Sequence, residues 1–312
     1  MRSNRDAALL PGVRLFSARL ILGVALAALA VGMASAAATA PQPSLPPMGP
    51  IDTPAAKADQ LEHDRIAGVA AFEHSDFATA TLYFKRVRQL DPSNDEGMFL
   101  LGRAYLATGD AAGAVDLFTS AIALNDKPEK YYYARAKAEM KVGKYAAAVA
   151  DFNRDLELRE GKGSATFFLA RGDAYLDNAE LDLAMGDFGQ VLASDDGELR
   201  LAHLHRGVAL ARKGDVAGAV EDLNAAEAIG RAANALDFDT FFYRGVVEQL
   251  GGDKPSALRD YKAALDFKDD RQPLAQCLLD EVKGKRRGLF GSTPKECHDF
   301  RAAKALALPP KS

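Results

Sequence analysis

Small residues recur at a nearly fixed interval along the apolar-periodic part of this chain. The six positions are Gly68, Gly102, Ala136, Gly172, Gly207 and Gly245, and successive intervals are 34, 34, 36, 35 and 38 residues. A glycine inside a helix costs about 1 kcal/mol relative to alanine, so its recurrence indicates a structural requirement at this position. A glycine-rich phosphate loop is the other use of such residues, but it would occur once rather than six times.

Two further positions follow the small residue at constant spacing. Twelve residues after it the chain always has alanine, at Ala80, Ala114, Ala148, Ala184, Ala219 and Ala257. Four residues later comes a large apolar residue, at Phe84, Phe118, Phe152, Phe188, Leu223 and Tyr261. A Gly-Asp or Gly-Lys pair falls between the small residue and the alanine in four units, as in Gly109-Asp110 and Gly214-Asp215. Glycine suits the left-handed residue that ends a helix, and aspartate suits the cap of the next one.

The interval and residue types resemble the tetratricopeptide repeat family, whose units are helix–turn–helix pairs of about 34 residues. The resemblance covers residues 55–271 and implies an all-α fold, a right-handed α-solenoid of about six units with C-terminal capping helices. The aligned units begin near Leu61, Asp95, Glu129, Ala165, Arg200 and Phe238. In each unit the small residue is expected to face the alanine across two closely packed helices, with the large residue filling the space alongside. Three residues after the large apolar residue, the family has a small apolar residue. Unit three departs from this pattern, because it has Asp155 at that position.

Charged residues repeat in step with this pattern. In the last four units an arginine directly precedes the small residue, and an aspartate lies sixteen residues later. These residues are Arg135, Arg171, Arg206 and Arg244, followed by Asp151, Asp187, Asp222 and Asp260. We expect each arginine to face its aspartate across the two helices of a unit, as a partly buried pair that specifies register. Four repeated ligand sites are the alternative, and the position of the pairs beside the buried small residue disfavours it.

The N-terminal residues are typical of a secretory signal peptide. Four arginines precede a fourteen-residue apolar run, residues 20–33. The run is followed by Ala34-Ser35-Ala36, a small-residue cleavage pattern. A membrane span needs about 20 apolar residues. We therefore expect residues 1–36 to be cleaved and the protein to be exported, to the periplasm if the cell is bacterial. An uncleaved anchor is the alternative. Residues 37–54 are proline-rich and are predicted to form an extended linker.

Charge and motif content exclude several classes of protein. The whole chain has a net charge of -4, and removal of residues 1–36 leaves -7. A nucleic-acid-binding protein would instead have a concentrated basic patch. The chain has no phosphate-loop, nucleophile-elbow or zinc-type motif, so the sequence predicts no enzyme, no cofactor and no metal. His203 and His205 are two residues apart on a predicted helix, and they would point to different faces rather than share an ion.

Residues 272–312 form a separate C-terminal segment that holds both cysteines, Cys277 and Cys297. An even number of cysteines in an exported chain predicts one disulfide. We expect a helix from Pro273 to about Gly284 and a second one from Thr293, which the disulfide would join into a cap on the last unit. The basic stretch 283–287 is predicted to be a solvated loop, with contact to an acidic membrane surface or partner as the alternative.

The resemblance also implies a concave face that is lined by the first helices and binds partners. In units two and three the family's surface positions fall on Phe99, Arg103, Lys130, Tyr133, Lys137 and Lys141. Such a groove would suit an acidic or carboxylate-bearing peptide with apolar anchors, unless the aromatic rings merely pack between units. The predicted function is therefore a non-catalytic protein–protein interaction scaffold in the cell envelope, which binds a protein or peptide. A self-associating structural protein is the alternative, an unrecognised enzyme is disfavoured, and membrane contact is not indicated.

Overall fold

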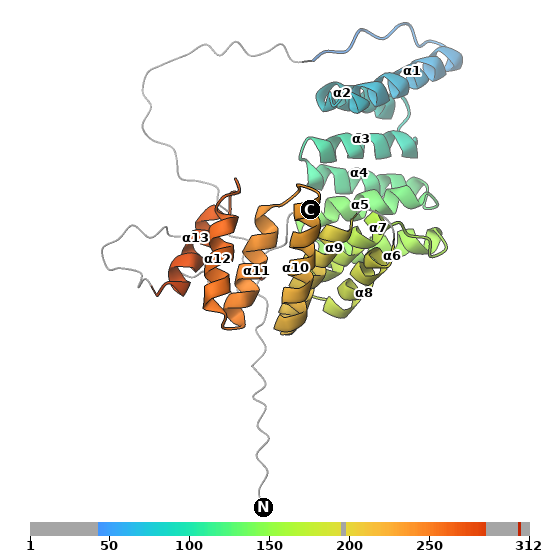
Figure 1. Cartoon of the computed structure of the whole chain (residues 1–312). Coiled ribbons are helices and arrows are strands. Elements are labelled where there is room, and N and C mark those ends of the chain that lie inside the picture. Colours follow the sequence, from blue (N-terminus) through green and yellow to red (C-terminus); the bar gives the residue numbers. More distant parts are fainter. Residues whose placement is uncertain (1–42, 195–197, 285–304, 307–312) are drawn as a thin grey trace, which may run out of the picture. The chain divides into compact units, whose positions relative to one another are not determined.

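The computed structural model describes residues 43–194, 198–284 and 305–306, which all belong to one compact unit, Pro43–Ser312. These residues form thirteen helices and no strand, and Figure 1 shows the helices following one another in chain order. The helices are α1 (Pro54–Glu73), α2 (Phe77–Leu90), α3 (Asp95–Ala107), α4 (Ala111–Leu124), α5 (Glu129–Val142), α6 (Tyr145–Leu158), α7 (Ala165–Asp177), α8 (Leu181–Leu192), α9 (Leu199–Lys213), α10 (Val216–Ala232), α11 (Phe238–Leu250), α12 (Lys254–Ala264) and α13 (Gln272–Val282). The predicted all-α repeat fold is confirmed.

Successive helices pair into six hairpins, from α1–α2 to α11–α12, and α13 packs on α12 and α11. Each hairpin also packs on the next, and first helices of neighbouring units touch one another, as α1 touches α3 and α9 touches α11. The apolar interior forms two clusters. One lies around α1 to α5, and the other extends from α5 to α13 and includes residues 305–306. Each unit therefore buries its apolar residues against its neighbours, as stacked repeats must.

The recurring glycine lies directly against the large apolar residue of its own unit. A Cβ at Gly172 would lie 2.5 Å from Cε1 of Phe188, and the same is true of Gly102 with Phe118 at 2.7 Å. At Gly207 a Cβ would lie 3.0 Å from Cγ of Leu223 and 3.2 Å from the backbone oxygen of Ala219, so there the small residue faces both the large residue and the alanine. The alanines are fully buried, and in units two and four the ring is the group that a Cβ on the glycine would meet first.

The predicted turns between the two helices of a unit are confirmed. Gly109 and Gly214 have φ of +90° and +89°, a region that residues with a Cβ rarely adopt. The aspartates that follow, Asp110 and Asp215, cap the next helix by accepting a hydrogen bond from a backbone N–H three residues on. Each turn thus both ends one helix and begins the next.

The described parts of the two terminal segments follow the sequence prediction. The proline-rich segment contacts the first unit at residue 46, where Nη1 of Arg86 on α2 donates to the backbone oxygen of Pro46 at 2.8 Å. The helix expected from Pro273 is α13, followed by Gly284 with φ of +68°. The signal peptide of residues 1–36 and the second helix expected from Thr293 lie outside the described residues.

The departure at Asp155 produces a buried carboxylate. Asp155 on α6 is fully buried, and its Oδ1 accepts a hydrogen bond from Nε of Arg159 at 2.8 Å. Burial raises the pKa of Asp155, and Arg159 opposes this increase. Arg159 thus compensates locally for a carboxylate placed where other units have a small apolar side chain.

Candidate partner-binding surface

The four predicted arginine–aspartate pairs are all formed, and each is bidentate. Nε and Nη2 of Arg171 donate to the two carboxylate oxygens of Asp187 at 2.8 and 2.7 Å. The other pairs have the same geometry. Side chains of the aspartates are at most 9% exposed. The pairs therefore lie within the repeats as structural elements, and the bidentate geometry fixes the two helices of a unit against each other.

Each of three arginines also bonds to the preceding unit, which the sequence analysis missed. Nη1 of Arg171 donates to Oδ1 of Asn153 at 3.0 Å, and Nη1 of Arg244 donates to Oδ1 of Asn224 at 2.9 Å. In unit three Arg135 makes the same contact with Thr119. Unit four has Gly189 at the position that holds Thr119, Asn153 and Asn224 in units two, three and five. Glycine has no side chain that could accept a bond from Arg206. The arginines thus link successive units as well as the helices within one.

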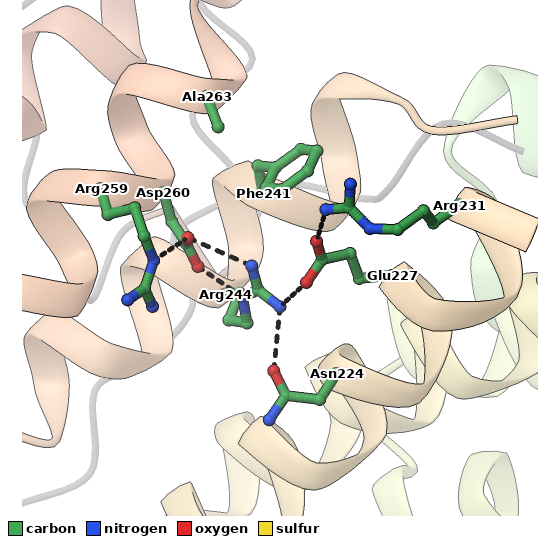
Figure 2. A pocket seen from close by; sticks show the side chains of 8 residues that line it. All are labelled: Asn224, Glu227, Arg231, Phe241, Arg244, Arg259, Asp260 and Ala263. Carbon is green, nitrogen blue, oxygen red and sulfur yellow. Dashed lines mark hydrogen bonds and ion pairs between the residues drawn. The ribbon is translucent and has the colours of Figure 1, made fainter. Parts of the chain in front are cut away.

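The junction between units five and six contains a cavity of about 440 Å³ (Figure 2). The residues that line it are Asn224, Glu227, Arg231, Phe241, Arg244, Arg259, Asp260 and Ala263. Glu227 pairs with Arg231 and Arg244, while Asp260 pairs with Arg244 and Arg259. Burial lowers the pKa of Arg244, but its bonds to Asp260 and Glu227 outweigh this effect and raise it. Because every charged side chain that lines the cavity already has an ion-pair partner, we assign the cavity to the inter-unit network rather than to a ligand.

Two buried glutamates accompany the first and last of these pairs. Glu139 on α5 and Glu248 on α11 each lie four residues after the arginine of their unit. The pKa of Glu139 is raised to about 7, chiefly by burial and secondly by the negative charge of Asp151. Burial, followed by the charge of Asp260, likewise raises the pKa of Glu248. The burial of these two glutamates could not be predicted from the sequence, because a lone glutamate on a helix is usually exposed.

The two histidines lie on different faces of α9, as the sequence predicted, but His205 is the interior one. His205 is fully buried, and its Nδ1 lies 2.5 Å from Oδ1 of Asp173 on α7. His203 is partly exposed and lies 2.8 Å from Oδ1 of Asp222. The described residues contain no group of three or more histidine, cysteine or carboxylate side chains arranged to hold a metal. Both histidines add hydrogen bonds to carboxylates of the repeats.

The aromatic residues predicted for the binding face are largely covered by neighbouring units. Phe99 is only 7% exposed, and its ring lies 4.9 Å from that of Tyr131, centroid to centroid. Tyr133 is partly buried, with its ring 5.6 Å from that of Phe152 and 6.2 Å from that of Phe167. This placement supports the packing alternative for Phe99 and leaves only part of Tyr133 accessible to a partner.

The cations predicted for the same face are accessible. Arg103, Lys130 and Lys141 are exposed, and Lys137 is partly exposed. The guanidinium carbon of Arg103 lies 4.7 Å from the ring centroid of Phe72 on α1, and Nζ of Lys130 lies 5.1 Å from that of Phe99. On α5 the three lysines fall at intervals of seven and four residues, so they share one face of the helix.

A small cavity of about 60 Å³, with both apolar and charged lining residues, lies beside these cations, between α1, α2 and α3. It is lined by Val69, Phe72, Glu73, Phe84, Leu100 and Arg103. Arg103 therefore borders both this cavity and the basic face. We call Arg103, Lys130, Lys137 and Lys141 with this cavity the basic face of α3 and α5.

The remaining predicted feature is the C-terminal disulfide. Cys277 is buried on α13, with 6% of its surface exposed. Cys297 and the basic stretch from residue 285 on lie outside the described residues. The disulfide therefore stays a prediction. Within the described residues, no helix combines the length and the apolar composition needed to span a bilayer.

Helical hairpins stacked through a repeated glycine–ring contact and a repeated ionic network define an α-helical repeat protein. Sequence models of the tetratricopeptide repeat family match residues 71–138, 133–198 and 169–234, which together exceed half of the chain. The chain belongs to the tetratricopeptide repeat family. These repeats make it a protein–protein interaction scaffold, because the units of this family generally bind protein or peptide partners.

Individual relatives match parts of the chain. DnaJ homolog subfamily C member 3 of Bos taurus is 36% identical over 100 residues, or 31% of this chain and 19% of that protein, and the Homo sapiens protein is 35% identical over the same length. The match thus spans about a fifth of these relatives. The structure of PilW, a type IV pilus biogenesis factor, has a TM-score of 0.57 with 13% identity, covering 68% of this chain and 96% of PilW. MamA from Desulfovibrio magneticus RS-1 has a TM-score of 0.52 with 20% identity, covering 56% of this chain and 97% of MamA. At these identities, the two similarities support the fold of this chain and nothing about its function.

Proposed function

We propose that this protein is an exported, non-catalytic scaffold that binds an acidic segment of a protein partner on the basic face of α3 and α5. The observation that carries the proposal is the row of accessible cations on this face. Oε1 of Glu96 lies 3.9 Å from Nζ of Lys130. Among the described residues, no carboxylate forms an ion pair with Arg103, Lys137 or Lys141. Unpaired cations on one face attract a chain of opposite charge and orient it as it binds.

The cavity beside Arg103, whose lining includes Val69, Phe84 and Leu100, adds a second element of recognition. Its volume of about 60 Å³ is suited to one aliphatic side chain rather than a whole ligand. We therefore expect the partner segment to carry an aliphatic residue close to acidic ones. A cation that borders a small pocket selects such a segment, because the charge sets the register and the apolar residues of the pocket supply buried apolar area.

The location that we propose is the cell envelope, the periplasm if the cell is bacterial. It rests on the N-terminal basic and apolar residues and on the Ala34-Ser35-Ala36 pattern. N-terminal sequencing of the protein from its own cells tests this, together with fractionation. A mature chain that begins near residue 37 in the periplasmic fraction supports export with cleavage. An intact N-terminus in the membrane fraction would replace it with the uncleaved anchor.

The partner is tested by co-purification of the tagged protein from its own cells after mild crosslinking. The variant is Arg103→Glu/Lys137→Glu, and the control is Lys162→Glu/Lys262→Glu, which makes the same change of charge on exposed residues of a loop and of α12. We expect an envelope protein to co-purify with the unchanged and control chains and to be lost from the variant. The circular dichroism spectra of all three chains should agree.

The other outcomes lead to different conclusions. If the variant retains its partner, the basic face is not the binding surface. If the chain captures only itself, self-association replaces the scaffold proposal, and analytical ultracentrifugation of the purified protein would then show concentration-dependent oligomers.

A further inference from the structure

The first-helix face changes character along the array. The residue directly after the small repeat position is Arg103 in unit two and Lys137 in unit three, where it is accessible. In units five and six the same position is Val208 and Val246, and both are fully buried. Since equivalent side chains are accessible in the earlier units, this face must be covered by other residues in the last two.

Two residues near the C-terminus are buried in the same apolar cluster as this face. Ala305 is fully buried and Leu306 is 6% exposed, and both belong to the apolar cluster that contains Val208 and Val246. Residues 305–306 come more than twenty residues after the end of α13, at Val282. The chain therefore returns to units that precede its last helix.

Arg212 anchors this return. It lies on α9, where Nε donates to the backbone oxygen of Leu306 at 2.5 Å and Nη1 donates to that of Leu176, in α7, at 2.8 Å. Burial lowers the pKa of Arg212, and the charge of Asp177 opposes this effect. The guanidinium thus joins units four and five to residue 306 through backbone oxygens, which any peptide segment could supply.

We infer that the first-helix face of α9 and α11 is a binding site for an apolar peptide segment, and that residues 305–306 of the same chain fill it as an internal ligand. The site holds a backbone carbonyl at Arg212 and places the neighbouring apolar side chains in the cluster that contains Val208 and Val246. Its occupation leaves the basic face of α3 and α5 as the part of the first-helix surface open to a partner. This inference does not depend on the proposed partner.

The test uses the full chain and a labelled peptide with the sequence of residues 299–310. An internal ligand competes at an effective concentration of the order of 1 mM, so the unchanged chain should bind the added peptide weakly. Leu306→Asp places a charge in the apolar site and should release the segment. By fluorescence anisotropy we expect the peptide to bind the Leu306→Asp chain at least tenfold more tightly than the unchanged chain. Leu183→Asp, at an exposed leucine of α8, is the matched control and should behave as the unchanged chain does.

Two results would overturn the inference. One is equal binding of the peptide to all three chains, and the other is no binding to a folded Leu306→Asp chain. A peptide that itself carries Leu306→Asp must also fail to bind. If the Leu306→Asp chain does not fold, hydrogen exchange in the unchanged chain decides. An internal ligand opens locally, so the amides of residues 305–306 should exchange at least 100-fold faster than that of Val208, whereas equal rates would make these residues a permanent part of the core.

Discussion

The contact between Gly172 and Phe188 determines how closely α7 and α8 approach, and Gly172→Ala tests it. The added Cβ would lie 2.5 Å from Cε1 of Phe188, whereas ordinary contacts begin at 3.4 Å, so the two must separate by about 0.9 Å. Overpacking of this kind costs about 1–3 kcal/mol. Alanine regains about 1 kcal/mol of helix propensity. We therefore expect a net loss of up to about 2 kcal/mol in the free energy of unfolding.

Gly186→Ala, in α8 of the same unit, is the matched control. A Cβ at Gly186 would have no atom within 4 Å, so only the propensity gain of about 1 kcal/mol applies. Urea denaturation followed by circular dichroism should give a lower midpoint for Gly172→Ala and a higher one for Gly186→Ala. The two variants differ in the contact with the ring, so their difference measures its cost.

A Gly172→Ala chain as stable as the Gly186→Ala chain would refute this account, because the glycine would then not be required for close approach. Phe188→Leu provides a second check in the Gly172→Ala background. Unit five combines Gly207 with Leu223, and a Cβ there would be 3.0 Å from the leucine rather than 2.5 Å from a ring. The leucine should therefore recover part of the lost stability.

Further predictions concern the ionic network. Asp222→Ala should lower the denaturation midpoint by the equivalent of about 3 kcal/mol, since it leaves Arg206 partly buried without its carboxylate; Glu157→Ala, in an exposed ion pair, should leave the midpoint unchanged. Gly189→Asn should raise the denaturation midpoint, because the amide would supply the inter-unit acceptor for Arg206 that other units have. A Cβ at this position would have no atom within 4 Å. An unchanged or lower midpoint would contradict this prediction. Between about pH 4.5 and 7 the raised pKa of Glu139 makes the folded chain bind more protons than the unfolded chain, so stability falls as the pH rises through this window. Glu139→Gln should flatten that fall when midpoints are compared from pH 4.5 to 8, and an unaltered slope would count against it.

The repeated contacts could be predicted from one sequence because six copies of a unit act as an internal comparison. A glycine, an alanine and a ring at constant spacing must meet in three dimensions, and Arg206 with Asp222 follows the same logic. The inter-unit acceptor escaped detection because its residue type changes from unit to unit. Threonine, asparagine and glycine share a place in space there, but they do not form a recognisable pattern in the sequence.

Exposure on the binding face was only partly predictable. The repeat register placed Arg103 and Lys137 on the first-helix face, and long charged side chains reach solvent from most such positions. The burial of Phe99 depends on Tyr131 of the next unit, and the burial of Val208 accompanies the return of residues near 306. Both require contacts between units, which the register of a single repeat does not specify.

Arg103 links the stability of the N-terminal units to their proposed function. Its guanidinium stacks on Phe72 of α1, in units that lack the repeated arginine–aspartate pair, so it also contributes to packing between α1 and α3. Arg103→Lys keeps the charge but stacks less well, and it should lower stability while retaining the partner. Lys137→Glu reverses a charge, and Lys137 has no ion pair among the described residues, so it should weaken partner binding and leave stability unchanged. If both variants instead lose the partner only in proportion to their loss of stability, the basic face acts through folding, and charge is not what the partner recognises.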